Sequence, residues 1–148
     1  LVMALAADDQ LVICHVGDSR AYIFNEEGLS QVTDDHSLVN ELIRSGEITE
    51  LEGEHHPQRN IVTQAIGGTE QVESEINHFD LSQVDYLLLC SDGLSNMVNH
   101  KQMLEYFKSH QSLDTLGEAL IDAANEAGGS DNITVVLASD LMNEEVTD

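Results

Sequence analysis

Apolar runs at the start of the chain alternate with short polar breaks, a pattern typical of β-hairpins. Leu1–Ala7 and Leu11–Val16 are separated by three polar residues, which predicts two antiparallel strands. Ala21–Phe24 and Leu29–Thr33 predict a second hairpin, because the four residues between them are polar and end in a glycine that suits a turn.

Helical spacing appears in the middle of the chain and again toward its end. Leu38, Leu42 and Ile43 predict a helix around Ser37–Ser45. The segment that starts at Thr49 has the form of a capping box, which indicates a second, short helix. Two longer helices are expected, one capped by Asn99 and running to about Ser109, the other along the apolar stripe Leu113, Leu116, Leu120, Ala123 and Ala127.

Four further apolar or alternating segments complete the pattern. Ile61–Ile66 predicts a strand or a short helix, and Val72–Phe79 predicts a polar edge strand. Tyr86–Cys90 is continuously apolar, as in a central strand, and Ile133–Ala138 is the last predicted strand. Because most strands are joined by short hairpins, we expect an α+β fold, layered, with an antiparallel sheet.

Length and charge narrow the classes of function. The 148 residues suggest one domain, which we place at 1–142, followed by a frayed tail at 143–148. The formal net charge of −23 disfavours nucleic acid as a partner, because phosphate backbones would be repelled. The charge indicates either a plain solvated surface or a site where bound cations offset part of it. No apolar run is long enough to span a bilayer, so we expect no membrane partner.

Two features concern the chain's setting. Cys14 and Cys90 lie in apolar strand-like stretches, which favours reduced core thiols and a cytoplasmic location. The chain starts abruptly in a strand-like run without an initiator Met, so we expect it to be cut from something longer.

The candidate chemistry lies in two acidic loops. Asp92 follows the Tyr86–Cys90 run, and Asp131 precedes the last strand. Antiparallel neighbours would bring both carboxylates to one edge of a sheet, and hard divalent cations such as Mg²⁺ or Mn²⁺ prefer such oxygen ligands. Each aspartate alone is also a common turn residue, but together they favour a metal site.

A third polar break carries Asp18. It interrupts strand-like sequence, which suggests a β-bulge that presents a carboxylate. Asp18 is either a metal ligand or part of a local hydrogen-bond network with Arg20 that holds the bulge. His36, His55 and His56 are weaker candidates, and His15 shows no pattern at all.

Five blocks occur in order along most of the chain: Val16–Tyr22 with its Gly-Asp-Ser-Arg, Asp35–Leu38, His56–Gly67, Leu89–Leu94 with its Ser-Asp-Gly, and Gly129–Thr134 with its Ser-Asp-Asn. In this order the blocks resemble the metal-dependent protein serine/threonine phosphatases, the protein phosphatase 2C family, in its bacterial branch.

The resemblance implies a layered antiparallel β-sandwich flanked by helix pairs, with a site for two Mn²⁺ or Mg²⁺ ions. Asp92 and Asp131 match metal-ligand positions, and Asp18 matches the position that helps to hold a third metal in bacterial members. Gly46–His55 matches the mobile flap beside the active site. The implied reaction is attack on a phosphoserine or phosphothreonine by a metal-activated water.

The family's N-terminal portion is missing from this sequence, including an Asp-Gly-x-Gly-Gly-His block with a metal-bridging aspartate. We therefore expect a C-terminal part of a phosphatase that has little activity alone and assign no catalytic residue. The alternatives are a non-catalytic binding or regulatory module of phosphatase fold, or an acidic domain that binds no metal.

The family implies phosphoprotein substrates and an opposing bacterial Ser/Thr kinase. An uncovered strand Leu1–Ala7 predicts a homodimer.

Overall fold

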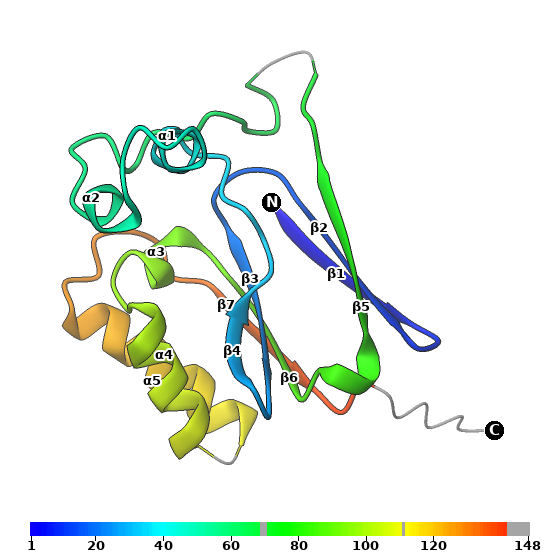
Figure 1. Ribbon diagram of the computed structural model, residues 1–148. Helices are drawn as coiled ribbons and strands as arrows, with labels where there is room; N and C mark the ends of the chain where they lie inside the picture. The colour runs from blue at the N-terminus through cyan, green and yellow to red at the C-terminus, as the bar shows by residue number, and fades with distance from the viewer. Residues whose placement is uncertain (69–70, 111, 142–148) are drawn as a thin grey trace.

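Two antiparallel β-sheets form the centre of the chain in the computed structural model, which describes residues 1–68, 71–110 and 112–141 (Figure 1). The first sheet has the order β1 (Val2–Ala7), β2 (Gln10–His15), β5 (Glu75–Asp80). The second has the order β4 (Gly28–Gln31), β3 (Arg20–Asn25), β6 (Tyr86–Cys90), β7 (Val135–Ser139). The strands predicted at Leu1–Ala7, Leu11–Val16, Ala21–Phe24 and Tyr86–Cys90 are confirmed, the last in the interior of its sheet.

The helices are α1 (Leu38–Arg44), α2 (Glu50–Glu54), α3 (Asp92–Ser95), α4 (His100–Ser109) and α5 (Leu113–Glu126), with a 3-10 turn η1 (Leu81–Gln83). The capping box predicted at Thr49 is present, and Asn99 caps α4 as expected. The α+β class with antiparallel sheets is therefore confirmed. No helix within the described ranges has the length and apolar character that crossing a membrane requires.

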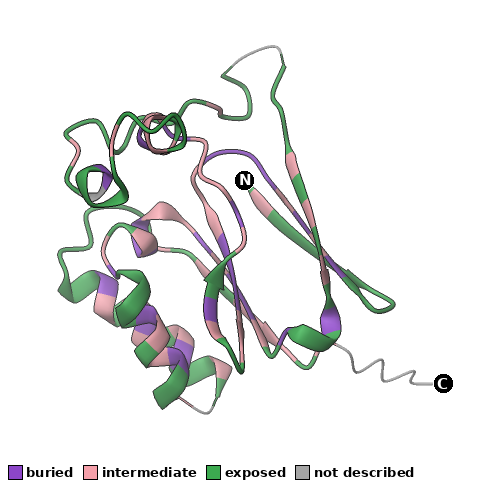
Figure 2. Cartoon of the chain, viewed as in Figure 1, coloured by how far each residue is buried: buried purple, intermediate pink, exposed green. Residues whose placement is uncertain are grey.

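Two apolar layers hold the elements together. Between the sheets, Leu11 and Ile13 of β2 pack with Ala21 and Ile23 of β3 and with Leu87. On the other face of the four-stranded sheet, α4 and α5 pack over β3 and β6, burying Tyr22, Leu88, Met103, Phe107 and Leu120. Figure 2 shows this burial concentrated between the layers and the exposure along β1 and the helix outer faces.

Two sequence expectations are wrong. Ile61–Ile66 is neither strand nor helix: a single bridge pairs Val62 with Ser37, and Ile66 is 60% exposed. The segment has apolar residues but no neighbouring strand for them to pack against. The predicted bulge at Asp18 is instead the connection between β2 and β3, which belong to different sheets. Gly17 makes that crossing with φ of 108°, a conformation that favours glycine.

One helix is additional to the prediction, and two strands begin later than predicted. Helix α3 was not predicted, because its four residues are too short to show periodicity. Strand β5 begins at Glu75, three residues after the predicted Val72, and β7 begins at Val135. The proposed domain boundary at 142 and the tail at 143–148 lie outside the described residues.

Candidate metal centre

Ser91 ties together the two loops that carry Asp92 and Asp131. Strands β6 and β7 are antiparallel neighbours, so the end of one lies beside the start of the other. The Ser91 hydroxyl donates to the carbonyl of Asn132 at 2.8 Å and accepts from the amide of Thr134 at 2.9 Å. These bonds fix the two acidic loops at one edge of the sheet, as the sequence predicted.

Gly93 allows the loops to approach this closely. A Cβ atom at this position would lie 2.3 Å from the carbonyl oxygen of Asn132, a separation that real Cβ atoms do not show. Glycine is therefore required here by the packing of one loop against the other. Asp92 and Asp131 flank this contact along the chain.

Asp18 joins the two aspartates electrostatically. Burial raises the pKa of Asp92, and the negative charges of Asp18 and then Asp131 raise it further. Asp92 has one weak side-chain partner, the Asn96 amide, which donates to it at 3.4 Å. Asp18, Asp92 and Asp131 thus repel one another. This surplus of negative charge favours a bound cation.

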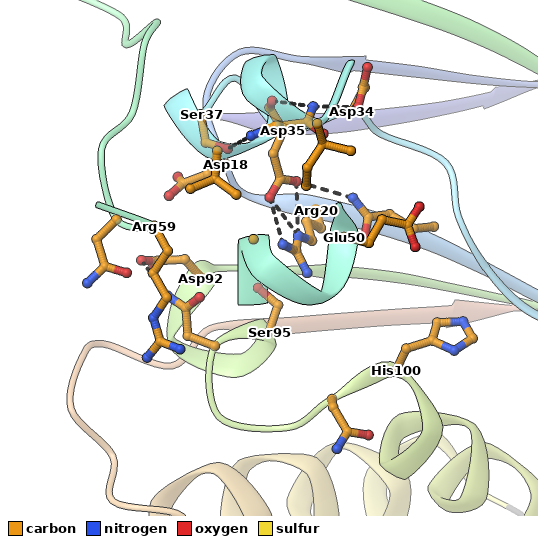
Figure 3. Close-up of a pocket in the computed structure, with 18 of the residues that line it drawn as sticks. Asp18, Arg20, Asp34, Asp35, Ser37, Glu50, Arg59, Asp92, Ser95 and His100 are labelled. Carbon is orange, nitrogen blue, oxygen red and sulfur yellow. Dashed lines mark hydrogen bonds and ion pairs between the residues drawn. The ribbon is translucent and has the colours of Figure 1, made fainter. Parts of the chain in front are cut away.

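Two of the three carboxylates line an open cleft of about 1010 Å³. Asp18 and Asp92 line this cleft, whereas Asp131 lies outside its lining residues. Figure 3 shows α1 above the cleft, with Asp92 and Ser95 of α3 facing it from below. The three aspartates do not gather their oxygens into one compact ligand set, which fits the repulsion between unneutralised carboxylates.

An ion pair between Arg20 and Asp35 forms part of the cleft wall (Figure 3). Burial alone lowers the pKa of Arg20, but hydrogen bonds and charges from Asp35 and Tyr22 outweigh it and raise the pKa. The expected alternative for Asp18, a local network with Arg20, is therefore wrong: Arg20 bonds to Asp35 and Tyr22 instead. Sequence reasoning named Asp35 only as the start of the Asp35–Leu38 block and gave it no role.

Part of the Gly46–His55 segment, which the resemblance matches to a flap, lines the cleft. Glu50 and Gly53 of α2, followed by His55, line the cleft opposite α3. Arg59 also lines it, and Figure 3 draws its guanidinium beside Asp92. His100 lines the cleft as well, but its Nε2 bonds the carbonyl of Leu29 at 2.8 Å, which makes it a structural residue. The site therefore combines an acidic end with a wall of mixed charge.

Comparison with known proteins gives a consistent picture. The family model described as protein phosphatase 2C matches residues 1–138. The serine/threonine phosphatase stp of Listeria welshimeri is 46% identical over 137 residues, which cover 93% of this chain and 54% of that protein. The protein phosphatase PhpP of Streptococcus pneumoniae is 46% identical over 138 residues, 93% of this chain and 55% of that protein. The chain thus spans about half the length of the curated relatives it matches.

Solved structures agree in fold. The serine/threonine phosphatase Stp1 from Staphylococcus aureus superposes with a TM-score of 0.89 at 38% identity, over 93% of this chain and 54% of that one. The catalytic domain of the phosphatase PstP, crystallised with two manganese ions, gives a TM-score of 0.81 at 32% identity, over 93% of this chain and 56% of that one.

Proposed function

Since the chain belongs to the protein phosphatase 2C family, we propose that it supplies part of the metal site of a metal-dependent protein serine/threonine phosphatase. The observation that carries this proposal is the electrostatic coupling of Asp18, Asp92 and Asp131: burial and the charges of the other two aspartates raise the pKa of Asp92. Residues 1–142 then form the C-terminal part of a phosphatase domain.

The donor set fits a hard divalent cation. Carboxylate oxygens are the ligands that Mg²⁺ and Mn²⁺ prefer, and the mutual repulsion of these three carboxylates would be relieved by a bound cation. The two manganese ions in the PstP structure support Mn²⁺ or Mg²⁺ as the cofactor, two ions or, with Asp18, three. We assign Asp92 and Asp131 to the principal metal positions.

The reaction would be hydrolysis of phosphoserine or phosphothreonine. Bound metal supplies an activated water and neutralises phosphoryl charge. Asp18, Asp92 and Asp131 would hold the cations, and Ser91 with Gly93 keeps two of the loops in register. The Arg20–Asp35 pair fixes the wall beside Asp18. The residues present supply no complete catalytic set, so we propose that the 148-residue chain alone hydrolyses phosphate esters poorly.

The same premise suggests partners and a compartment. Phosphoproteins are the proposed substrates, because the relatives are named serine/threonine phosphatases, and a bacterial Ser/Thr kinase is the proposed opposing enzyme. Two free thiols, Cys14 and Cys90, support a cytoplasmic location. The exposed apolar face of β1 supports a homodimer of this chain.

A non-catalytic binding or regulatory module of phosphatase fold is the second candidate. The chain spans only about half of its relatives, and this observation favours that alternative for the chain taken by itself. Retention of three electrostatically coupled carboxylates favours the phosphatase.

A chimaeric protein would distinguish the phosphatase proposal from the binding-module alternative. The part of the Listeria welshimeri relative that this chain does not match would be joined to residues 1–148, and hydrolysis of a phosphothreonine peptide would be measured with millimolar Mn²⁺. The phosphatase proposal predicts turnover by the chimaera, little by the 148-residue chain, and loss of most turnover with Asp92→Asn or Asp131→Asn in a folded chimaera. Turnover unaffected by both substitutions would contradict the assigned ligands. A folded, inactive chimaera would favour the binding module.

A further inference from the structure

A second group of metal-ligating side chains lies outside the cleft, at the end of β2. His15, His36 and Glu75 each offer one ligand atom, and these atoms all lie within 4.8 Å of one another. His15 ends β2 and pairs across the ladder with Glu75, which begins β5, while His36 lies in the loop before α1. None of the three lines the cleft. Figure 1 shows β2 and β5 side by side at this end of the sheet.

The ring of His15 has an unused nitrogen. The residue is 1% exposed, and its Nε2 lies 2.8 Å from the carbonyl oxygen of Asp34. A carbonyl only accepts hydrogen bonds, so Nε2 carries the proton, and in the neutral ring Nδ1 keeps a free lone pair. That Nδ1 atom is buried without a hydrogen-bond partner among the described residues. Metal-ligating histidines commonly donate their other N–H to a backbone carbonyl in this way.

The other two side chains face His15 from different segments. The His36 ring lies 4.8 Å from the His15 ring, between centroids, with a tilt of 35°. The hydrogen bond that His36 Nδ1 accepts from the Gly17 amide is long, at 3.3 Å. A carboxylate oxygen of Glu75 lies 3.6 Å from His15 Nε2, and the Glu75 side chain is 37% exposed, which leaves it room to move.

Nothing cationic occupies this group among the described residues. Glu75 lies 3.6 Å from the protonated Nε2 of His15, whose ring is neutral in this tautomer. Arg20 forms its ion pair with Asp35, and Arg44 forms its ion pair with Asp34. The buried Nδ1 lone pair of His15 thus belongs to the same ring whose Nε2 side the Glu75 carboxylate approaches.

We propose that His15, His36 and Glu75 form a binding site for a transition-metal ion of the Zn²⁺ class, separate from the acidic cleft. Two imidazoles and one carboxylate are a ligand set that Zn²⁺ takes in proteins, with one position left for water. Mg²⁺ prefers oxygen ligands and does not compete for imidazole. The two sites therefore sort metals by ligand type. The ion would also join the end of β2, the loop before α1 and the start of β5, three segments that meet beside Gly17 and Asp18.

Zinc binding to the 148-residue chain tests this site without any measurement of activity. Isothermal titration with Zn²⁺ would be carried out in excess Mg²⁺, on a background that carries Asp92→Asn and Asp131→Asn to weaken the acidic site. We expect one equivalent of Zn²⁺ to bind. Loss of an outer-shell partner typically costs 10–100-fold in metal affinity, so Glu75→Gln and His36→Gln, which remove ligands, should each cost at least roughly tenfold.

His78→Gln is the matched control, because His78 lies exposed on the same strand β5, three residues from Glu75. Its affinity for Zn²⁺ should equal that of the background chain. His15 is left intact, because it is buried and its replacement threatens the fold. Nitrogen-15 NMR of the histidine rings should show zinc-induced shifts in two rings, His15 and His36, and no such shift in His78.

Two results would overturn the proposal: no zinc uptake in excess Mg²⁺, or unchanged affinity in both Glu75→Gln and His36→Gln. Circular dichroism of each variant confirms that the fold is intact. Because the readout is zinc binding on a background that lacks two acidic ligands, failure of the phosphatase proposal would leave this result standing, and the reverse also holds.

Discussion

Arg20 holds the carboxylate of Asp35 with three hydrogen bonds, of 2.7, 2.9 and 3.0 Å, across 15 residues of sequence. Both side chains are mostly buried, with 26% and 13% of their surfaces exposed. The pair links the first residue of β3 to the loop that leads into α1. It therefore sets the distance between the strand that follows Asp18 and the helices on the opposite side of the cleft.

Asp35→Asn should destabilise the fold by roughly 2–4 kcal/mol, because it leaves the guanidinium of Arg20 buried without its counter-charge. Urea unfolding followed by circular dichroism would measure this change. Asp34→Asn is the control: its ion pair with Arg44 is exposed, with 69% of the arginine side chain accessible, so its loss should cost less than about 1 kcal/mol. An equal loss in the free energy of unfolding for the two variants would show that the buried ion pair stabilises the fold no more than the exposed one does.

Gly93→Ala should destabilise the chain by roughly 2–3 kcal/mol, because the new Cβ would collide with the Asn132 backbone and force the two acidic loops apart. Gly117→Ala provides the matched change inside helix α5, where the nearest atom would be the Leu137 side chain at 3.5 Å. That substitution should be neutral or stabilising by up to about 1 kcal/mol, because alanine favours helix more than glycine does. The melting temperatures of both variants would test this prediction. A Gly93→Ala chain as stable as Gly117→Ala would contradict the tight contact between the two loops.

The two thiols should react at very different rates. Burial raises the pKa of the Cys90 thiol to about 12, and its residue is 2% exposed. Because the thiolate is the reactive form, Cys90 should resist iodoacetamide in the folded chain. Cys14 is only partly buried and should be labelled first. Mass spectrometry of a timed labelling reaction gives the order, and labelling of Cys90 before Cys14 would contradict the buried position of β6.

Association should follow from the exposed face of β1. Leu1, Met3, Leu5 and Ile76 are 50–63% exposed, and β1 is an edge strand whose outer side has no partner in the described sheet. Unpaired edges recruit other chains, while the net charge of −23 opposes association at low salt. Sedimentation velocity should therefore show a dimer that strengthens with salt and that Leu5→Lys weakens. A compact monomer at low and high salt would contradict the dimer.

The sequence predicted much of the fold because its strongest patterns are local. The hairpin of β1 and β2, the capping box at Thr49 and the apolar stripe of α5 each depend on near neighbours in the chain. The prediction of a strand or helix at Ile61–Ile66 was wrong, because its apolar residues have no strand to pair with. Only the tertiary arrangement reveals this.

Some residues of the candidate site were predictable from the sequence, and others were not. Asp92 and Asp131 were predictable because each lies at the end of an apolar strand, and antiparallel pairing brings such ends together. The Arg20–Asp35 pair was not predictable, since Arg20 begins β3 and Asp35 lies 15 residues later, in the loop that follows β4. His15, His36 and Glu75 likewise meet only through the register of β2 and β5 and a loop, so their spacing in sequence gives no signal.

The most direct measurement is the affinity of the 148-residue chain for Mn²⁺, compared with those of its Asp92→Asn and Asp131→Asn variants. In metal-free buffer, Asp92→Asn should leave the fold intact or slightly more stable, because it relieves repulsion from Asp18 and Asp131. We predict that Mn²⁺ raises the melting temperature of the parent chain and that each substitution weakens calorimetric Mn²⁺ binding by at least roughly tenfold. Mn²⁺ binding of unchanged affinity in both variants, or no binding by the parent chain, would contradict the assignment of these aspartates as metal ligands.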